Sequence, residues 1–163
     1  MDARETGWMT SLGLLVLRVG IGGLMAMHGI GKLLLLTGGT AANFGSWLGM
    51  PPTLALSLSV FAELICAVAI VLGLATRLCA AIVAFNMGVA VFVAHASAPL
   101  MMDAGYQAWA ADHNVYPASK EPALLFLIPF VALVLTGAGR LSLDAVIWPW
   151  WKRRRAAKVL AEA

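Results

Sequence analysis

The chain has 163 residues, of which 61% are hydrophobic and only 12% are charged. Soluble domains normally carry about 25% charged residues, so this composition excludes a small soluble globular domain. The apolar residues form four blocks, and each approaches the roughly 20 residues that a helix needs to cross a bilayer. We therefore expect an all-α integral membrane protein, a four-helix bundle in contact with the lipid bilayer.

The four blocks predict four membrane-spanning helices. The first covers Leu12–Leu36 and is too long to be the apolar core of a cleaved signal peptide. The second and third cover Thr53–Ala75 and Leu78–Ala98, with a tight connection between them. The fourth covers Glu121–Ala138. Because no linker or change of composition separates the blocks, we treat residues 1–163 as a single domain.

Basic residues predict the orientation of these helices. Five of the eleven Lys and Arg lie in residues 152–158, and Arg77 and Arg140 fall at the same end of a bundle with an even number of helices. The connection between the first two helices has no charge. The positive-inside rule then places both termini in the cytoplasm of a bacterial-type inner membrane. Asp144 follows Arg140 by four residues, so we expect a surface ion pair on this cytoplasmic side.

The C-terminal segment predicts contact with the membrane surface. Trp148, Trp150 and Trp151 directly precede the run of basic residues. Aromatic residues followed by basic ones are typical of an interfacial anchor beside anionic lipids. We interpret residues 148–163 as a basic cytoplasmic tail and expect no nucleic-acid partner.

Two charged residues lie deep within the predicted helices. A charge at the bilayer centre costs at least ~3 kcal/mol on insertion scales, so such residues normally face the bundle interior and pair. Arg18 and Glu63 differ in depth by roughly 9 Å at the rise of an α-helix, within reach of a long side chain. We expect them to form a buried polar pair. Such a pair can fix helix register without taking part in any chemistry.

A second group of ionisable residues lies nearer the outer surface. Counted along each helix, His28 and Glu121 lie at about 24–26 Å from the cytoplasmic end and Lys32 lies near 30 Å. Ordinary alternatives exist: a packing histidine, a lysine that reaches the head groups and a carboxylate favoured by a helix N-terminus. Because intramembrane ionisable groups mark functional sites by default, we expect the three to line a ligand pocket.

The third predicted helix places its polar residues less favourably. Asn86 and His95 are nine residues apart, about half a turn out of phase at roughly 100° per residue. Both can face the bundle axis only if this helix is bent. A haem held by His28 and His95 is therefore a weak alternative. The sequence has no cysteine cluster for iron–sulfur and no dinucleotide fingerprint, so we expect no metal site and no intrinsic cofactor.

Three stretches together resemble the DoxX family: LLVLRVGIGGLMAMHGIGKL, the Glu63 segment FAELICAVAIVLGLATRLCA, and KEPALLFLIPFVALVLTGAGRLSLD. The resemblance extends from Leu14 to Ile147 and implies a small four-helix membrane protein. Members of the family are linked to an archaeal thiosulfate oxidoreductase that reduces quinone and to a mycobacterial redox-defence complex. More distant relatives act as membrane chaperones and cargo receptors. The positions that match the family pattern are Arg18, His28, Lys32, Glu63, Glu121, Arg140 and Asp144.

Residues and resemblance lead to one expectation about function and one alternative. We expect a quinone- or lipid-binding subunit of a membrane redox complex, with quinone as the bound cofactor and a protein partner or a second copy beside it. Because no redox centre is evident, the electrons must come from that partner. The alternative is a non-catalytic membrane scaffold or chaperone. A proton-coupled transporter is disfavoured, because four helices leave little room for alternating access unless a dimer forms.

Overall fold

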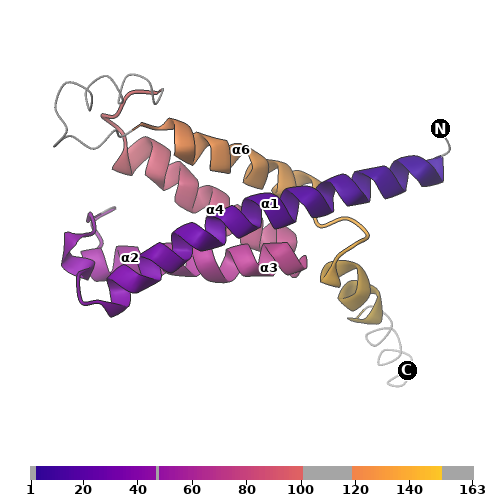
Figure 1. Ribbon diagram of the computed structural model, residues 1–163, viewed down its shortest axis with the longest axis horizontal. Coiled ribbons are helices and arrows are strands. Elements are labelled where there is room, and N and C mark those ends of the chain that lie inside the picture. Colours follow the sequence, from indigo (N-terminus) through magenta and orange to yellow (C-terminus); the bar gives the residue numbers. More distant parts are fainter. Residues whose placement is uncertain (1–2, 47, 101–118, 152–163) are drawn as a thin grey trace, which may run out of the picture.

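The computed structural model describes residues 3–46, 48–100 and 119–151, and their regular elements are all helices (Figure 1). The all-α fold class predicted from the sequence is confirmed. The basic part of the predicted tail, from residue 152 onward, lies outside the described residues.

The longest element is α1, Ala3–Thr37, with 35 residues. At 1.5 Å per residue it is about 52 Å long, well beyond the roughly 30 Å hydrocarbon core of a bilayer. Its N-terminal end therefore projects past the other helices (Figure 1). A short 3-10 turn, η1 (Ala41–Asn43), follows in the connection to the second helix.

The second long helix runs from Pro52 to Leu72 without interruption. Pro52 lies in its first turn, where the missing backbone N–H has no intrahelical partner to lose. The helix ends at Gly73, whose φ of 70° is the left-handed conformation that commonly terminates helices. Its three consecutive segments are α2 (Pro52–Val60), the π-helical η2 (Phe61–Cys66) and α3 (Ala67–Leu72).

The third and fourth helices lie side by side along the bundle (Figure 1). The third contains α4 (Thr76–Val89) and ends in a second π-helical segment, η3 (Ala90–Ala94). The fourth, α6 (Glu121–Thr136), has 16 residues and is apolar but shorter. Within residues 3–46, 48–100 and 119–151, three helices are therefore long and apolar enough to cross a membrane, and α6 completes the bundle. All four predicted segments coincide with helices.

Small residues allow α1 to approach the second helix closely. A Cβ atom built at Gly29 would lie 2.6 Å from the backbone carbonyl carbon of Glu63, and one at Gly22 would lie 3.2 Å from the carbonyl oxygen of Ala67. Glycine at these positions permits near backbone-to-backbone packing, as in other membrane helix pairs. The core beneath this contact consists of Met25, Cys66, Ala67, Ile70, Ala80, Val83, Met87, Phe130 and Leu133.

The outer surface of the bundle is apolar. Leu24, Phe85 and Leu135 are 60%, 69% and 73% exposed, respectively. Large exposed apolar side chains on every long helix are what lipid contact requires, because tails of lipid are as apolar as these residues. The start of α1 and the short helix at residues 143–151 lie at one end, and the α1–α2 connection lies at the other (Figure 1). The cytoplasmic placement of both termini stays a prediction.

Candidate functional site

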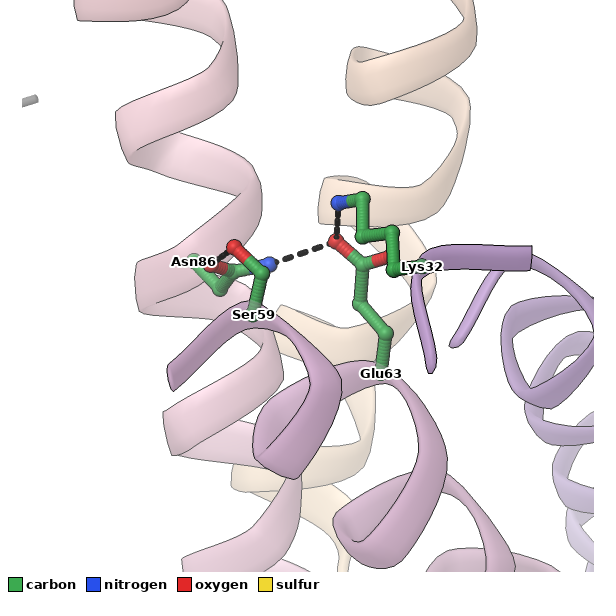
Figure 2. A network of polar contacts seen from close by, with 4 residues as sticks. All are labelled: Lys32, Ser59, Glu63 and Asn86. Atoms are coloured by element: carbon green, nitrogen blue, oxygen red, sulfur yellow. Dashed lines mark hydrogen bonds and ion pairs between the residues drawn. The ribbon is translucent and has the colours of Figure 1, made fainter. Parts of the chain in front are cut away.

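An ion pair inside the bundle joins α1 to the second helix. The Lys32 ammonium donates a hydrogen bond to the Glu63 carboxylate (Figure 2). The Glu63 side chain is only 2% exposed, whereas the Lys32 side chain is 26% exposed. Removal of a carboxylate from water is unfavourable unless a charged or hydrogen-bonding partner accompanies it. Lys32 provides that partner and keeps one side of the pair accessible.

The third helix contributes a second partner to the same carboxylate. The Asn86 side-chain amide donates to Glu63 Oε1 at 2.7 Å, and the Ser59 hydroxyl donates to Asn86 Oδ1 at 3.3 Å (Figure 2). Glu63 therefore lies where α1, the second helix and α4 meet, and its oxygen accepts from both a cation and an amide. Hydrogen bonds to an ionised group are shorter and stronger than neutral ones.

A cavity of about 160 Å³, called here the His28 cavity, lies on one side of the ion pair. His28 is exposed, and its ring packs edge-on against Phe126 with 5.3 Å between centroids and 84° between planes. Such an edge-to-face arrangement is one of the favoured geometries of a ring pair. The lining residues are Met25, His28, Lys32, Glu63, Met87, Ala90, His95, Pro122, Ala123 and Phe126.

A second cavity of about 300 Å³, called here the Asn86 cavity, also borders the ion pair. The Lys32 ammonium lies 5.6 Å from the centre of the Phe44 ring, within the range of a cation–π contact. Lys32, Glu63, Ala90 and His95 line both cavities, so the two cavities adjoin at the ion pair. The lining residues are Lys32, Phe44, Gly45, Ser59, Glu63, Asn86, Val89, Ala90, Ala94 and His95.

Both π-helical segments border this site. Glu63 lies in η2, and Ala90 and Ala94 lie in η3. The amide of His95 donates to the carbonyl of Ala90, five residues earlier, at 2.9 Å. A π turn holds more residues than an α turn, and such turns occur frequently at functional sites. The wider turn changes the phase of the residues after it, so Asn86 and His95 both line the Asn86 cavity.

A family model described as DoxX matches residues 13–96, which are 84 of the 163 residues. The chain belongs to the DoxX family. No curated protein and no solved structure matches it. The matched segment includes α1 from Gly13 onward and ends just after η3, so every member of the Lys32–Glu63–Asn86–Ser59 network lies inside the DoxX match.

The predicted ligand-binding residues are brought together only in part. His28 and Lys32 line the His28 cavity, and Glu63 joins them. Glu121 does not line either cavity, although its neighbour Pro122 lines the His28 cavity. Ser59 and Asn86 were not predicted as site residues. The available signal was an asparagine inside an apolar segment, and the π turn that aligns it with His95 left no mark in the sequence pattern.

The predicted pair between Arg18 and Glu63 is wrong, although both residues are buried. The Arg18 guanidinium donates to the carbonyls of Ile70 (3.3 Å) and Val71 (3.4 Å) and to the carbonyl of Leu141. The physical reason is that the last carbonyls of α3 lack their regular α-helical donors and carry partial negative charge, and the Ile70 carbonyl can accept from Arg18 as well as from the Gly73 amide. They attract Arg18, while Lys32 turns inward to Glu63.

The expected surface pair between Arg140 and Asp144 is also not formed. The Asp144 carboxylate instead accepts from the amides of Ala75 at 2.7 Å and Thr76 at 2.9 Å. These amides begin α4 and have no helical acceptor, so a carboxylate is favoured there. The Arg140 guanidinium lies beside Gly7 on α1, where a Cβ would be 3.3 Å from Nη2.

Arg77 also binds a helix end. Its Nη2 donates to the carbonyl of Leu135 in the last turn of α6 at 3.1 Å. Arg18, Asp144 and Arg77 therefore all hydrogen-bond backbone groups at helix ends. These helix ends lie at the end of the DoxX bundle that the sequence predicts to be cytoplasmic.

In the described part of the chain, no group of three or more His, Cys, Asp or Glu is arranged to hold a metal ion. Cys66 and Cys79 are free thiols, and both pack in the core.

Proposed function

We propose that this DoxX protein binds a quinone head group in the His28 cavity and acts as the quinone-binding subunit of a membrane redox complex. The observation that carries the proposal is the composition of this cavity. It combines an ion pair and two histidines with the apolar side chains Met25, Met87 and Phe126. Ligand sites in proteins are mostly apolar with a small number of placed polar groups.

The polar residues match the hydrogen-bonding needs of a quinone. A quinone carbonyl oxygen only accepts hydrogen bonds, and the Lys32 ammonium only donates them. His28 in its neutral form offers one N–H donor. Glu63 holds the lysine at the cavity wall. The two ends of a quinone ring can therefore both find donors, while Phe126 and the two methionines contact its faces.

The cavity size favours a single ring with its tail outside. Its volume of about 160 Å³ lies below the roughly 300–1,000 Å³ of sites that enclose a drug-sized ligand. His28 is exposed at the bundle surface, and its neighbour Met27 is 67% exposed. A hydrophobic tail at this opening would continue directly into lipid, which suits an isoprenoid quinone.

The electrons must come from another protein. The chain has no cysteine cluster for an iron–sulfur centre and no dinucleotide fingerprint. We therefore place a redox partner beside the bundle, with both termini of the DoxX chain in the cytoplasm of a bacterial inner membrane. The basic residues at 152–158, Arg77 and Arg140 support that orientation.

Ligand-dependent stabilisation tests the proposed site. A ligand that binds only the folded state raises the melting temperature. We expect a short-chain quinone to stabilise the purified wild type and the control Met27→Leu, and to have no effect on His28→Leu. Met27 adjoins His28 but does not line the cavity. If all three proteins respond equally, or none responds to any quinone, the site is wrong and a scaffold function becomes the better interpretation.

A further inference from the structure

The proposed quinone site gives no role to the Asn86 cavity, the larger of the two cavities that border the ion pair. Half of the residues around the Asn86 cavity are polar: Lys32, Ser59, Glu63, Asn86 and His95. Within the membrane, side chains that can hydrogen-bond normally face one another or a water-filled space. The direct contacts of Ser59 and Asn86 run toward Glu63, so the polar surface leads to the carboxylate.

The Asn86 cavity has the properties that internal water requires. A cavity needs only about 10–15 Å³ to hold one water, together with two to four polar partners for it. The Asn86 cavity has about 300 Å³. The His28 cavity is smaller, and Met25, Met87 and Phe126 give it more apolar walls. Water is therefore favoured on the Asn86 side and an aromatic ring on the His28 side.

The cavity leads toward the aqueous surface at the α1–α2 connection. Phe44 and Gly45, which follow η1 in that connection, form part of its wall and are half-buried. Lys32 lies at the same end, and its side chain is 26% exposed while that of Glu63 is 2% exposed. Exposure therefore rises from the buried carboxylate toward the connection.

We propose that the Asn86 cavity is a hydrated vestibule through which protons from water at the α1–α2 end of the bundle reach the Glu63 carboxylate. The purpose of this proton path rests on the proposed quinone site. A quinone that accepts two electrons from the partner's redox centre takes up two protons to become a quinol. Glu63 and His95 line both cavities, so they are the groups that can pass those protons from the vestibule to the ring.

Thiol labelling tests the water in the vestibule without any quinone. In a Cys66→Ala/Cys79→Ala background, Val89→Cys places a thiol in the vestibule wall. Phe85→Cys, one turn away on α4 at a position 69% exposed to lipid, is the matched control. A charged methanethiosulfonate reagent reacts with thiolates in water and does not enter hydrocarbon. In lipid nanodiscs, we expect reaction at Val89→Cys and none at Phe85→Cys.

Two outcomes of the labelling overturn the vestibule. If Val89→Cys does not react, the cavity is dry. If Phe85→Cys reacts equally, the reagent reaches α4 from all sides, and no defined water path exists. Added quinone gives a further discrimination: a thiol at Ala123→Cys, in the wall of the His28 cavity alone, should be protected from a neutral thiol reagent, while Val89→Cys should remain reactive. Equal protection of both thiols would contradict two separate cavities.

Infrared spectroscopy tests the proton exchange itself. In Lys32→Met, recorded at a pH low enough to protonate the Glu63 carboxyl, the carboxylic acid C=O band should shift in D₂O. We expect a rapid shift in this variant and a shift at least tenfold slower when Val89→Phe also fills the vestibule. Equal rates would overturn the route. Because neither experiment needs quinone, a positive result with no quinone-induced stabilisation would reject the proposed function and leave the vestibule in place.

Discussion

Two basic residues on α1 lie fourteen positions apart and have opposite surroundings. Arg18 is fully buried, and its guanidinium donates to backbone carbonyls at the end of α3 and to Leu141. Lys32 is partly exposed and donates to a side-chain carboxylate that borders two cavities. Backbone carbonyls cannot titrate or turn away, whereas a carboxylate can exchange a proton or a partner. From this difference we infer that Arg18 stabilises the fold, and we propose that Lys32 takes part in the function of the site.

The segment that follows α6 strengthens the structural assignment. Only glycine fits at position 73, because a Cβ there would lie 2.2 Å from Arg18 Nη1. The carbonyl of Gly73 also accepts from the amide of Asp144 at 2.8 Å. Arg18 and Asp144 thus fasten residues 141–144 to the turn between α3 and α4. Two of the charged positions of the DoxX resemblance at this end, Arg18 and Asp144, therefore make helix-end contacts.

The largest effect is expected from Arg18→Leu. Charge-assisted hydrogen bonds contribute about 1.5–3 kcal/mol each, so the loss of several should lower the unfolding free energy by about 3 kcal/mol or more. Thermal unfolding in detergent measures this. The quinone-induced rise in melting temperature should persist in the folded fraction. A stable Arg18→Leu variant that has lost the quinone response would contradict the structural role of Arg18 and would place Arg18 in the ligand site instead.

A double-mutant cycle distinguishes the pair that forms from the pair that the sequence predicted. Removal of one partner of a buried pair typically costs about 3–5 kcal/mol, because the other charge remains; the partial exposure of Lys32 places it at the lower end. We expect Lys32→Met and Glu63→Gln to be strongly non-additive. Arg18→Leu and Glu63→Gln should be additive within about 0.5 kcal/mol. Coupling of Arg18 with Glu63 would contradict the structure.

Gly29→Ala tests the close approach that positions Glu63. Its methyl group would lie 2.6 Å from the backbone of Glu63 and Leu64, so α1 must move away. Overpacking of this kind costs about 1–3 kcal/mol. At Gly31 nothing lies within 4 Å of the corresponding Cβ, and Gly31→Ala should raise stability by about 0.5–1 kcal/mol through helix propensity. Equal melting temperatures for the two variants would exclude tight packing at Gly29.

Asp144→Ala should have the smallest effect. It removes a cap from the first amides of α4, which typically costs about 0.5–2 kcal/mol. Asp144→Asn retains a side-chain oxygen acceptor and should recover at least half of that loss. Both variants should bind quinone as the wild type does, measured by thermal shift. If Arg140→Ala reproduced the loss of Asp144→Ala, the surface ion pair rejected above would have to be reconsidered.

The helices were predictable because hydropathy over about 20 residues is a strong local signal. Every charged or polar residue of the site was also visible as an exception inside an apolar segment. The partners were not predictable. A helical count assumes an unbroken α-helix, whereas η2 and η3 each contain a wider turn that changes which residues share a face. The count also gives no weight to backbone carbonyls at helix ends, which are the actual partners of Arg18.

Glu121 shows the limit of prediction from depth alone. Its level matches that of His28 by residue count, yet the rotation of α6 directs Ala123 and Phe126 into the His28 cavity and leaves Glu121 out of its wall. Rotation of a short helix depends on packing against its neighbours. In α6 that packing involves the buried residues Phe130 and Leu133. The direction of the Glu121 side chain therefore cannot be predicted from the sequence without knowledge of the core.

Photo-crosslinking with an azido-quinone tests the division of the bundle most directly. The chain in lipid nanodiscs would be irradiated with the probe, digested and mapped by mass spectrometry. The account predicts labels on α1 around Met25–His28 and on α6 around Ala123–Phe126, both suppressed by excess unlabelled quinone. Labels confined to residues 137–148, beside Arg18 and Asp144, would contradict the claim that the Lys32 end of the molecule is the functional one.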